Sequence, residues 1–166
     1  LGDGDRAMAV LRTVDPVYRT ATPEGAERYR VEPYAVAGDV AGAPPHAGRG
    51  GWTWYTGTAA WTWRLIVEAI LGLRRAAGVL EIDPCIPRTW PGFEAEIREG
   101  KALYRIRVEN PDGVCRGVKR LTLDGQPLPA AKVPLADDGN EHEIAVQLGE
   151  AIPHARQAAL LPASQS

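Results

Sequence analysis

The spacing of apolar residues is helical in the first half of the chain. Residues 5–14 carry apolar side chains at intervals of three and four, which predicts a helix with Asp5 as its N-cap and Asp15-Pro16 as its end. Residues 20–30 are polar and irregular, and residues 31–40 form an apolar segment in which we expect a short helix. This first region therefore predicts two helices joined by an irregular stretch.

A loop rich in glycine and proline, residues 42–51, precedes a second amphipathic pattern. Residues 58–75 repeat apolar side chains at intervals of three and four, which predicts a long helix with Trp61 on its buried stripe. The arginines at 74–75 are expected in its last turn, where cations suit the helix dipole, and Gly78 is expected as its C-terminal stop.

After Gly78 the period changes to two, which predicts strands. Glu99-Gly100-Lys101 is expected to turn a hairpin, and Asp124-Gly125 to end a strand. The expected strands are residues 79–82, 93–98, 103–108, 118–123 and 143–148. Short strands at regular spacing predict an antiparallel β-sandwich. The fold class expected for the whole chain is therefore α+β.

The pattern divides the chain into a helical part, residues 1–78, a β part, residues 79–152, and a tail rich in alanine and serine, residues 153–166, expected to be flexible. Two helices cannot bury their apolar faces alone, so neither part is expected to be self-sufficient. We therefore expect the chain to be a piece of a larger protein, with the rest of the parent polypeptide as its partner.

Composition excludes several classes of function. The 166 residues carry a formal net charge of −2, which gives no electrostatic footprint for nucleic acid or anionic lipid. No long apolar run predicts insertion into a membrane. Cys85 and Cys115 lack the spacing of a zinc or CxxC motif, so no metal site is expected. They are able to pair, but two sparse cysteines favour reduced thiols and a cytoplasmic setting.

Candidate chemistry concentrates where the loop runs into the second helix. Thr56, Gly57 and Thr58 stand at the expected helix start, where N–H groups and hydroxyls suit an anion such as phosphate. The alternative is that Thr56 or Thr58 serves only as an N-cap. Arg49 is either a further anion partner or a solvated loop residue.

Aromatic residues crowd the same segment, because four of the five tryptophans fall between residues 52 and 63. Tryptophans belong more often to a core than to a ligand platform, and Trp61 fits that role. Trp52 and Trp54, on the loop, are the better candidates for stacking against a sugar ring. The pattern thus suggests a sugar face beside an anion site.

Three separated motifs carry a resemblance to a known family. The run Gly-Gly-Trp-Thr-Trp-Tyr-Thr-Gly-Thr-Ala-Ala-Trp at 50–61 resembles the phosphate-site signature of glycoside hydrolase family 94, the inverting carbohydrate phosphorylases. The motifs at 70–73 and 82–87 follow in the expected order, and Glu32-Pro33-Tyr34 fits upstream. The resemblance covers residues 1–110, and the later strands fit the family's last domain.

The resemblance implies an (α/α)₆ barrel followed by a C-terminal β-sandwich, with residues 1–78 as the last barrel helices. It implies that phosphate attacks the anomeric carbon with inversion while a carboxylic acid protonates the departing oxygen. By position Thr56, Gly57 and Thr58 would bind phosphate, and Trp52, Trp54, Arg49, Glu32 and Tyr34 would contact the sugar. Inorganic phosphate is then a co-substrate, and no other cofactor is implied.

The family's catalytic acid lies upstream of the matched segment, so no catalytic residue is expected in this chain. Gly38 stands where disaccharide phosphorylases carry glutamine, and residues 34–40 look more like the β-1,2-glucan branch of the family. That branch implies a β-glucan oligosaccharide substrate and a parent protein at the cytoplasmic face of the inner membrane. A non-catalytic carbohydrate-binding module and a structural cap remain as alternatives.

Overall fold

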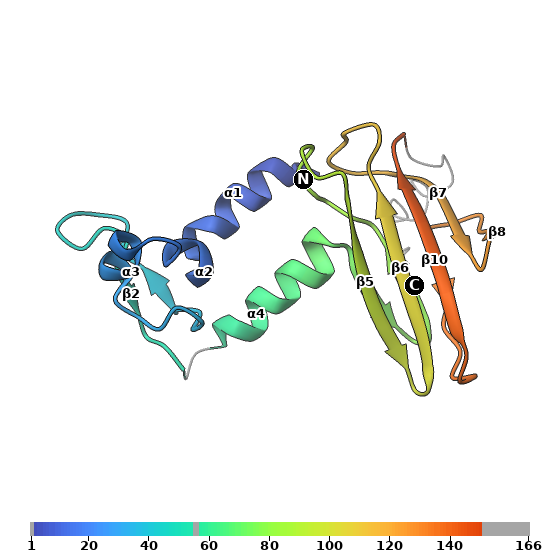
Figure 1. The fold of residues 1–166 in the computed structure, drawn as a ribbon, viewed down its shortest axis with the longest axis horizontal. Coiled ribbons are helices and arrows are strands. Elements are labelled where there is room, and N and C mark those ends of the chain that lie inside the picture. The colour runs from blue at the N-terminus through green and yellow to red at the C-terminus, as the bar shows by residue number, and fades with distance from the viewer. Residues whose placement is uncertain (1, 55–56, 151–166) are drawn as a thin grey trace, which may run out of the picture.

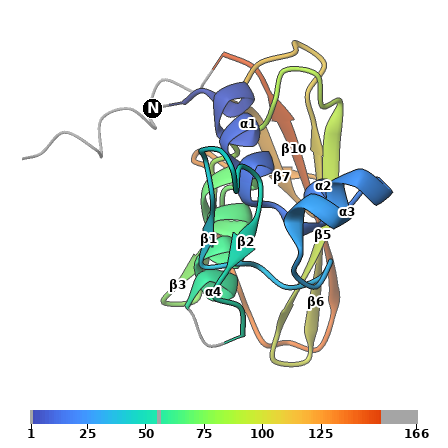
Figure 2. The same cartoon turned by 90° about the vertical axis from the view of Figure 1, so that its left-hand side faces the viewer.

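The computed structural model describes residues 2–54 and 57–150. The tail predicted at 153–166 therefore lies outside the described residues. The shorter helices lie on the left of Figure 1 together with a two-stranded sheet, the other strands lie on the right, and α1 (Gly4–Val14) and α4 (Thr58–Arg64) run between the two groups. Figure 2 looks onto the helical part, with the larger sheet behind it. Apart from the two-stranded sheet, the helical and β segments are thus separated along the chain, which confirms the α+β class.

The first helix, α1 (Gly4–Val14), begins one residue before the predicted cap. Asp3 is the N-cap, and its Oδ1 accepts a hydrogen bond from the Arg6 amide at 3.0 Å. The prediction of Asp5 is wrong because Asp5 already lies in the first turn. Its carboxylate accepts instead from the Arg88 amide at 3.0 Å and from Arg88 Nη1 at 2.8 Å.

Two short helices follow, α2 (Pro16–Arg19) and α3 (Pro23–Tyr29). The second lies in the stretch that the sequence predicted to be irregular, because Thr22 caps it and Pro23 suits its first turn. The helix predicted over 31–40 is absent. Pro33 disfavours a helical residue before it, and the segment ends instead in β1 (Asp39–Val40), paired with β2 (Gly50–Gly51).

The long second helix is real but shorter than predicted. It consists of α4 (Thr58–Arg64) and a π-helical continuation, η1 (Leu65–Ile70), in which the Leu71 amide donates to the Ile66 carbonyl at 2.8 Å. The predicted extension to residue 75 is wrong, because Gly72 turns the chain at a φ of +68°.

The arginines expected in the last helical turn lie in a strand, β3 (Leu73–Ala76), which forms a hairpin with β4 (Val79–Ile82). Gly78 belongs to the turn of this hairpin and does not stop the helix. The change from helix to strand therefore falls at Gly72, six residues before the position that the sequence pattern indicated.

The remaining strands form two sheets. β3 and β4 continue into β9 (Lys132–Pro134) in the order β3-β4-β9. The other sheet has the order β5-β6-β10-β7-β8, made of β5 (Gly92–Glu99), β6 (Ala102–Glu109), β10 (Glu141–Leu148), β7 (Val118–Leu123) and β8 (Gln126–Pro127). All five predicted strands are confirmed, as is the hairpin turn at Glu99–Lys101.

The purely antiparallel pattern expected for the β part is wrong at one pair. β10 runs parallel to β6 and antiparallel to β7. The reason is topological, because the last strand returns to insert between β6 and β7.

One hydrophobic core joins the two sheets to the helices. Tyr104, Ile106 and Val108 of β6 point into it, while Arg105 and Arg107 point outward, as the alternation predicted. Side chains from β4, β9 and β10 complete it, together with Leu11 of α1 and Ile70 of η1. Met8, Ile66 and Val67, which are partly buried, pack against the same core and help to attach the helical part to the sheets.

Candidate functional site

Two loops that are far apart in the sequence meet at Trp54. The Trp54 indole Nε1 donates a hydrogen bond to Glu32 Oε1 at 3.1 Å. The Trp54 and Tyr34 rings lie edge to face, with centroids 6.0 Å apart and an interplanar angle of 63°. The structure therefore brings together three of the residues that the sequence predicted to contact sugar.

The aromatic side chains of this region face solvent. Trp52 and Trp54 are 69% and 68% exposed, and Tyr34 is 71% exposed. Both tryptophans have a left-handed backbone, with φ of 54° and 76°, which is an outlying conformation for bulky residues and costs on the order of 1–3 kcal/mol each. Such strain is concentrated at functional sites, and here it accompanies the display of two large rings.

The loop that carries the tryptophans is held by backbone contacts. The Gly38 amide donates to the carbonyls of Gly51 and Trp52, both at 3.0 Å. Beneath it, the Tyr29 side chain is fully buried, and its hydroxyl donates to the Ala35 carbonyl at 3.3 Å. Gly38, which the sequence singled out as a departure from the disaccharide phosphorylases, thus positions the tryptophan loop through its amide.

Glu32 is an acceptor in this cluster. The hydrogen bond from Trp54 lowers the pKa of its carboxyl below the usual value, so the side chain is ionised at neutral pH. An ionised carboxylate accepts hydrogen bonds from hydroxyl groups and has no proton to give. Glu32 is therefore suited to hold a sugar hydroxyl and unsuited to act as a catalytic acid.

The start of α4 follows the tryptophan loop directly. Gly57 is the N-cap, and its carbonyl accepts from the Trp61 amide at 3.1 Å. Thr58 lies in the first turn, so the alternative of Thr58 as N-cap is wrong, while Thr56 lies outside the described residues. Three peptide units separate Trp54 from Gly57, which limits their Cα separation to at most ~11 Å. The aromatic loop and a helix N-terminus, which favours anions, are therefore neighbours.

Two other tryptophan-region predictions have different outcomes. Arg49 lines a separate pocket with Arg28, Arg30 and His46, away from the Trp54–Glu32 contact. Trp61 was predicted to be in the core and is 69% exposed, with the Arg64 guanidinium 5.7 Å from its ring centroid. That prediction is wrong because the helix packs against the core of the sheets through its second half, at Ile66, Val67 and Ile70, and not through Trp61.

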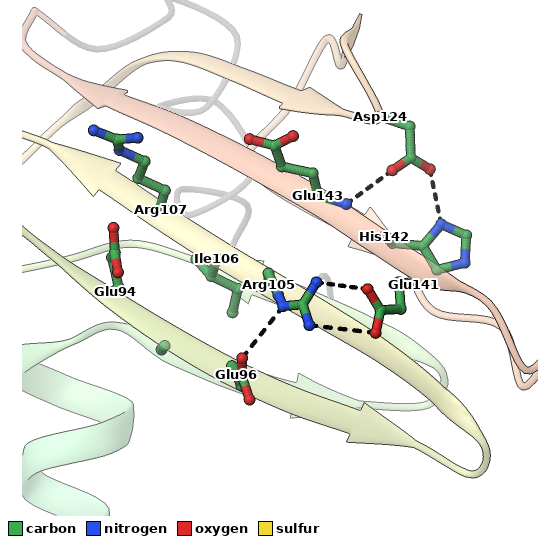
Figure 3. A pocket seen from close by; sticks show the side chains of 10 residues that line it. Glu94, Glu96, Arg105, Ile106, Arg107, Asp124, Glu141, His142 and Glu143 are labelled. Atoms are coloured by element: carbon green, nitrogen blue, oxygen red, sulfur yellow. Dashed lines mark hydrogen bonds and ion pairs between the residues drawn. The ribbon is translucent and has the colours of Figure 1, made fainter.

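The outer face of the five-stranded sheet forms a groove lined by charged side chains (Figure 3). Arg105 lies between Glu96, 3.4 Å from its Nε, and Glu141, 2.5 Å from its Nη1. All three side chains are more than half exposed, and exposed pairs of this kind add little stability. Opposite charges on neighbouring strands pair across this face, which is expected for a solvent-exposed surface of a sheet.

His142 carried no signal in the sequence, yet it has a defined environment. Its Nδ1 lies 2.7 Å from Asp124 Oδ2, its Nε2 lies 3.1 Å from Asp138 Oδ2, and its ring stacks on Tyr104. The two carboxylates raise the pKa of His142, and the histidine contributes to lowering the pKa of each aspartate. Only the turn signals at Asp124-Gly125 and Asp138-Gly139 hinted that two aspartates flank this strand.

Within the described ranges, one group of side chains has the proximity of metal ligands. Asp3, Asp5 and Cys115 place ligand atoms within 4.8 Å of one another. Asp3 caps α1, Asp5 holds Arg88, and the Cys115 thiol lies 3.7 Å from Asp5. These contacts explain the cluster structurally, and it carries no metal assignment. Cys85 and Cys115 are both free thiols.

Among residues 2–54 and 57–150, no helix is long and apolar enough to span a membrane.

Exposed aromatic rings bordered by a carboxylate are typical of proteins that bind carbohydrates, and here they adjoin the start of a helix. Comparison with known proteins agrees with that class. Residues 1–72 match the glycosyl hydrolase 94 superfamily, catalytic domain. Over that segment the chain matches the family that its motifs indicated, which confirms the resemblance.

Several relatives share longer stretches. The cyclic beta-(1,2)-glucan synthase NdvB of Rhizobium meliloti (strain 1021) is 47% identical over 104 residues, which are 63% of this chain and 4% of that protein. The N,N'-diacetylchitobiose phosphorylase of Vibrio proteolyticus is 37% identical over 150 residues, which are 90% of this chain and 18% of that enzyme.

A third relative is the 3-O-beta-D-glucopyranosyl-beta-D-glucuronide phosphorylase of Paenibacillus borealis, 43% identical over 93 residues, which are 56% of this chain and 12% of that enzyme. The chain thus spans less than a fifth of the length of the curated relatives it matches.

Proposed function

We propose that this chain supplies part of the sugar and phosphate site of an inverting β-glucan phosphorylase, with inorganic phosphate as co-substrate. The observation that carries the proposal is the Trp54–Glu32–Tyr34 cluster, which directly precedes the N-terminus of α4. The relatives include two phosphorylases, which supports phosphorolysis, and a cyclic β-(1,2)-glucan synthase, which supports β-1,2-glucan as the substrate.

The described residues take defined roles in this proposal. The exposed faces of Trp52 and Trp54 stack on sugar rings, while Glu32 and Tyr34 hydrogen-bond to sugar hydroxyls. The segment Thr56-Gly57-Thr58 binds the phosphate through backbone N–H groups and hydroxyls at the helix start.

In the reaction, a phosphate oxygen forms a bond to the anomeric carbon from the face opposite the glycosidic oxygen. The glycosidic bond breaks, and the departing oxygen takes a proton from a carboxylic acid. The proposal assigns this acid to another part of the parent polypeptide, because the family that the motifs resemble has its catalytic acid upstream of the matched segment and Glu32 accepts the hydrogen bond of Trp54.

In this arrangement residues 1–78 act as the last helices of an (α/α)₆ barrel, and residues 79–152 as the β-sandwich that closes it, in a cytoplasmic protein. The exposed apolar residues of α4, Trp61 and Trp63, support this organisation because they offer a surface for further helices. Arg49 is left outside the sugar site, since it lines a separate pocket.

A second candidate is a carbohydrate-binding module without chemistry. The observation that favours it is the exposure of Trp52, Trp54 and Tyr34, which form a sugar-binding surface without any catalytic group. The two candidates differ in whether the intact protein performs phosphorolysis.

The test is a kinetic separation of two variants in the intact protein that contains this chain, assayed with β-1,2-glucooligosaccharides and phosphate. Thr56→Val removes a hydroxyl from a charged ligand and is expected to weaken phosphate binding about ten- to a hundredfold. Trp54→Ala is expected to raise the KM for the oligosaccharide about tenfold and leave the KM for phosphate unchanged.

If the KM for phosphate is unchanged in Thr56→Val, Thr56 does not belong to the phosphate site. The chain alone is expected to release no sugar 1-phosphate. Release by the purified chain above the background of a mock preparation would contradict the assignment of the acid to another segment. Sugar binding without phosphorolysis in the intact protein would favour the binding module.

A further inference from the structure

A second pocket of the helical part gathers positive charge. It lies where α1, α2 and α3 meet the loop at 41–48, at the left of Figure 1, and has a volume of about 470 Å³. Arg12, Arg19 and Arg28 line it, together with Thr13 and Tyr18, and none of its lining residues is acidic. The three arginines come from three different helices, α1, α2 and α3, and it is the fold that brings them together.

Gly48 makes the convergence of two of these arginines feasible. It is buried, has a φ of +87°, and is fixed by a 2.7 Å hydrogen bond from its amide to the Ala41 carbonyl. A Cβ at this position would lie 2.8 Å from Arg28 Cδ and 3.3 Å from Arg19 Nη1. Only glycine therefore leaves room for both side chains as they stand.

Two of the arginines, Arg12 and Arg19, are oriented by contacts with groups that carry no negative charge. Arg19 Nε donates to the Thr13 carbonyl at 2.8 Å, and the Arg12 guanidinium lies 5.6 Å from the centroid of the Tyr18 ring. Among the described residues, none of the three forms an ion pair with a carboxylate. Like charges gathered in one place repel each other; solvent screens this repulsion at the exposed Arg12 and Arg28, and a bound anion turns it into attraction.

The surroundings keep the same sign. Arg28 also lines the adjoining pocket, where Arg30 and Arg49 accompany it and two glutamates, Glu24 and Glu27, are present. Arginines therefore outnumber carboxylates there as well. Asp15, next to this region, is engaged as the N-cap of α2, where its Oδ1 accepts from the Val17 amide at 3.0 Å.

We infer that this arginine pocket, defined by Arg12, Arg19 and Arg28, binds a multiply charged oxyanion, either inorganic phosphate or the phosphate monoester of a sugar. The planar guanidinium fork matches phosphate oxygens bidentately, and the Tyr18 side chain adds a hydroxyl group to the lining. The Thr13 hydroxyl donates to the Val10 carbonyl at 2.7 Å and is not assigned to the anion. The site is built from elements other than the start of α4, so it is additional to the phosphate site of the proposed function.

The experiment is calorimetric titration of the purified chain with inorganic phosphate and, separately, with glucose 1-phosphate at low ionic strength. Saturable binding that weakens with added sodium chloride is expected. The double variant Arg19→Gln/Arg28→Gln is expected to weaken it at least about tenfold, since each lost charged hydrogen bond has an effect of that size. Tighter binding of glucose 1-phosphate identifies the monoester as ligand, and equal binding identifies free phosphate; both support the inference.

A control separates this site from the rest of the surface. Arg105→Gln/Arg107→Gln removes the same charge from the outer face of the sheet and should retain binding. Absence of saturable binding overturns the inference, as does binding that is unchanged in Arg19→Gln/Arg28→Gln. Circular dichroism checks the fold, and the single variant Arg12→Gln replaces the double variant if that one is unfolded.

Discussion

At the scale of single residues, His142 shows how two turns can be joined through one side chain. Both ring nitrogens lie within hydrogen-bonding distance of carboxylates, Asp124 from the β7–β8 turn and Asp138 from the β9–β10 loop. A neutral imidazole donates from only one nitrogen, so two acceptors favour the protonated ring. Tyr104 stacks against the same ring from β6, and its hydroxyl accepts from the Ala136 amide.

This geometry predicts a pH dependence of stability. The folded-state pKa of His142 is raised above its unfolded value near 6.5, so its contribution is fully present below about pH 6.5 and is lost as pH rises through the folded pKa. The pKa values of Asp124 and Asp138 are lowered, so their contribution is present above about pH 4 and is lost as pH falls through their folded pKa values.

Urea unfolding of the chain at pH 6 and pH 9 measures the effect. The unfolding free energy of the original chain should be lower at pH 9 than at pH 6. The decrease should be smaller in His142→Gln. His46→Gln, on an exposed loop, is the control and should keep the original dependence. An identical pH dependence in His142→Gln and the original chain would rule out the protonated ring as its source.

At the scale of elements, Gly72 decides where the helix ends. Its φ of +68° turns the chain from η1 into β3, and a Cβ there would lie only 2.1 Å from the Asp83 carbonyl oxygen. The apolar spacing of three and four continues to Leu73, so the pattern alone extends the helix. The close approach of the non-strand segment that directly follows β4, at Asp83, is what requires glycine.

Gly72→Ala is therefore expected to destabilise the chain by at least about 3 kcal/mol, through backbone strain and the clash with Asp83. Gly78→Ala is a matched control, since its φ is +74° and no atom lies within 4 Å of its added Cβ. It should cost only the backbone term, about 1–2 kcal/mol. The measurement is the unfolding free energy of each variant. An equal decrease in Gly72→Ala and Gly78→Ala would show that the contact with Asp83 has no effect on stability.

At the scale of the whole molecule, the helical part is attached to the sheets at one end only. Ile70 and Leu11 enter the core, while Trp61 and Trp63 are 69% and 60% exposed and Leu65 is 41% exposed. Several large apolar side chains exposed on one helix indicate an interaction site. It fits the proposal that further helices of the parent polypeptide cover α4.

The chain by itself is accordingly expected to self-associate and to bind a hydrophobic dye. Trp61→Ser/Trp63→Ser should weaken the association at least about tenfold, because burial of one large apolar side chain contributes on the order of 1.5–3 kcal/mol. Sedimentation at several concentrations gives the association constant. Tyr34 is an exposed aromatic residue outside α4, so Tyr34→Ser should leave the association constant unchanged. A chain that stays monomeric and binds no dye would contradict the view that α4 has an uncovered apolar surface.

The sequence by itself determined those features whose signals are local. Alternation of apolar and charged residues predicted β5 and β6 and the sides on which Tyr104 and Arg105 lie. The dipeptide Asp124-Gly125 predicted a turn, and the motifs at 50–61 indicated the family and the residues of the candidate site. Each of these signals depends on a few neighbouring residues, which interact in the same way in any fold.

Only the tertiary structure decided which distant segments meet. It joined Trp54 to Glu32, inserted β10 beside β6 in a parallel orientation, and gathered the arginines of three helices around Gly48. It also left Trp61 exposed, although the residue lies on an apolar stripe. Periodicity reports which face of an element is apolar, but it contains no information on what packs there. That depends on the path of the chain, which is set by long-range burial and by steric limits such as the one at Gly72.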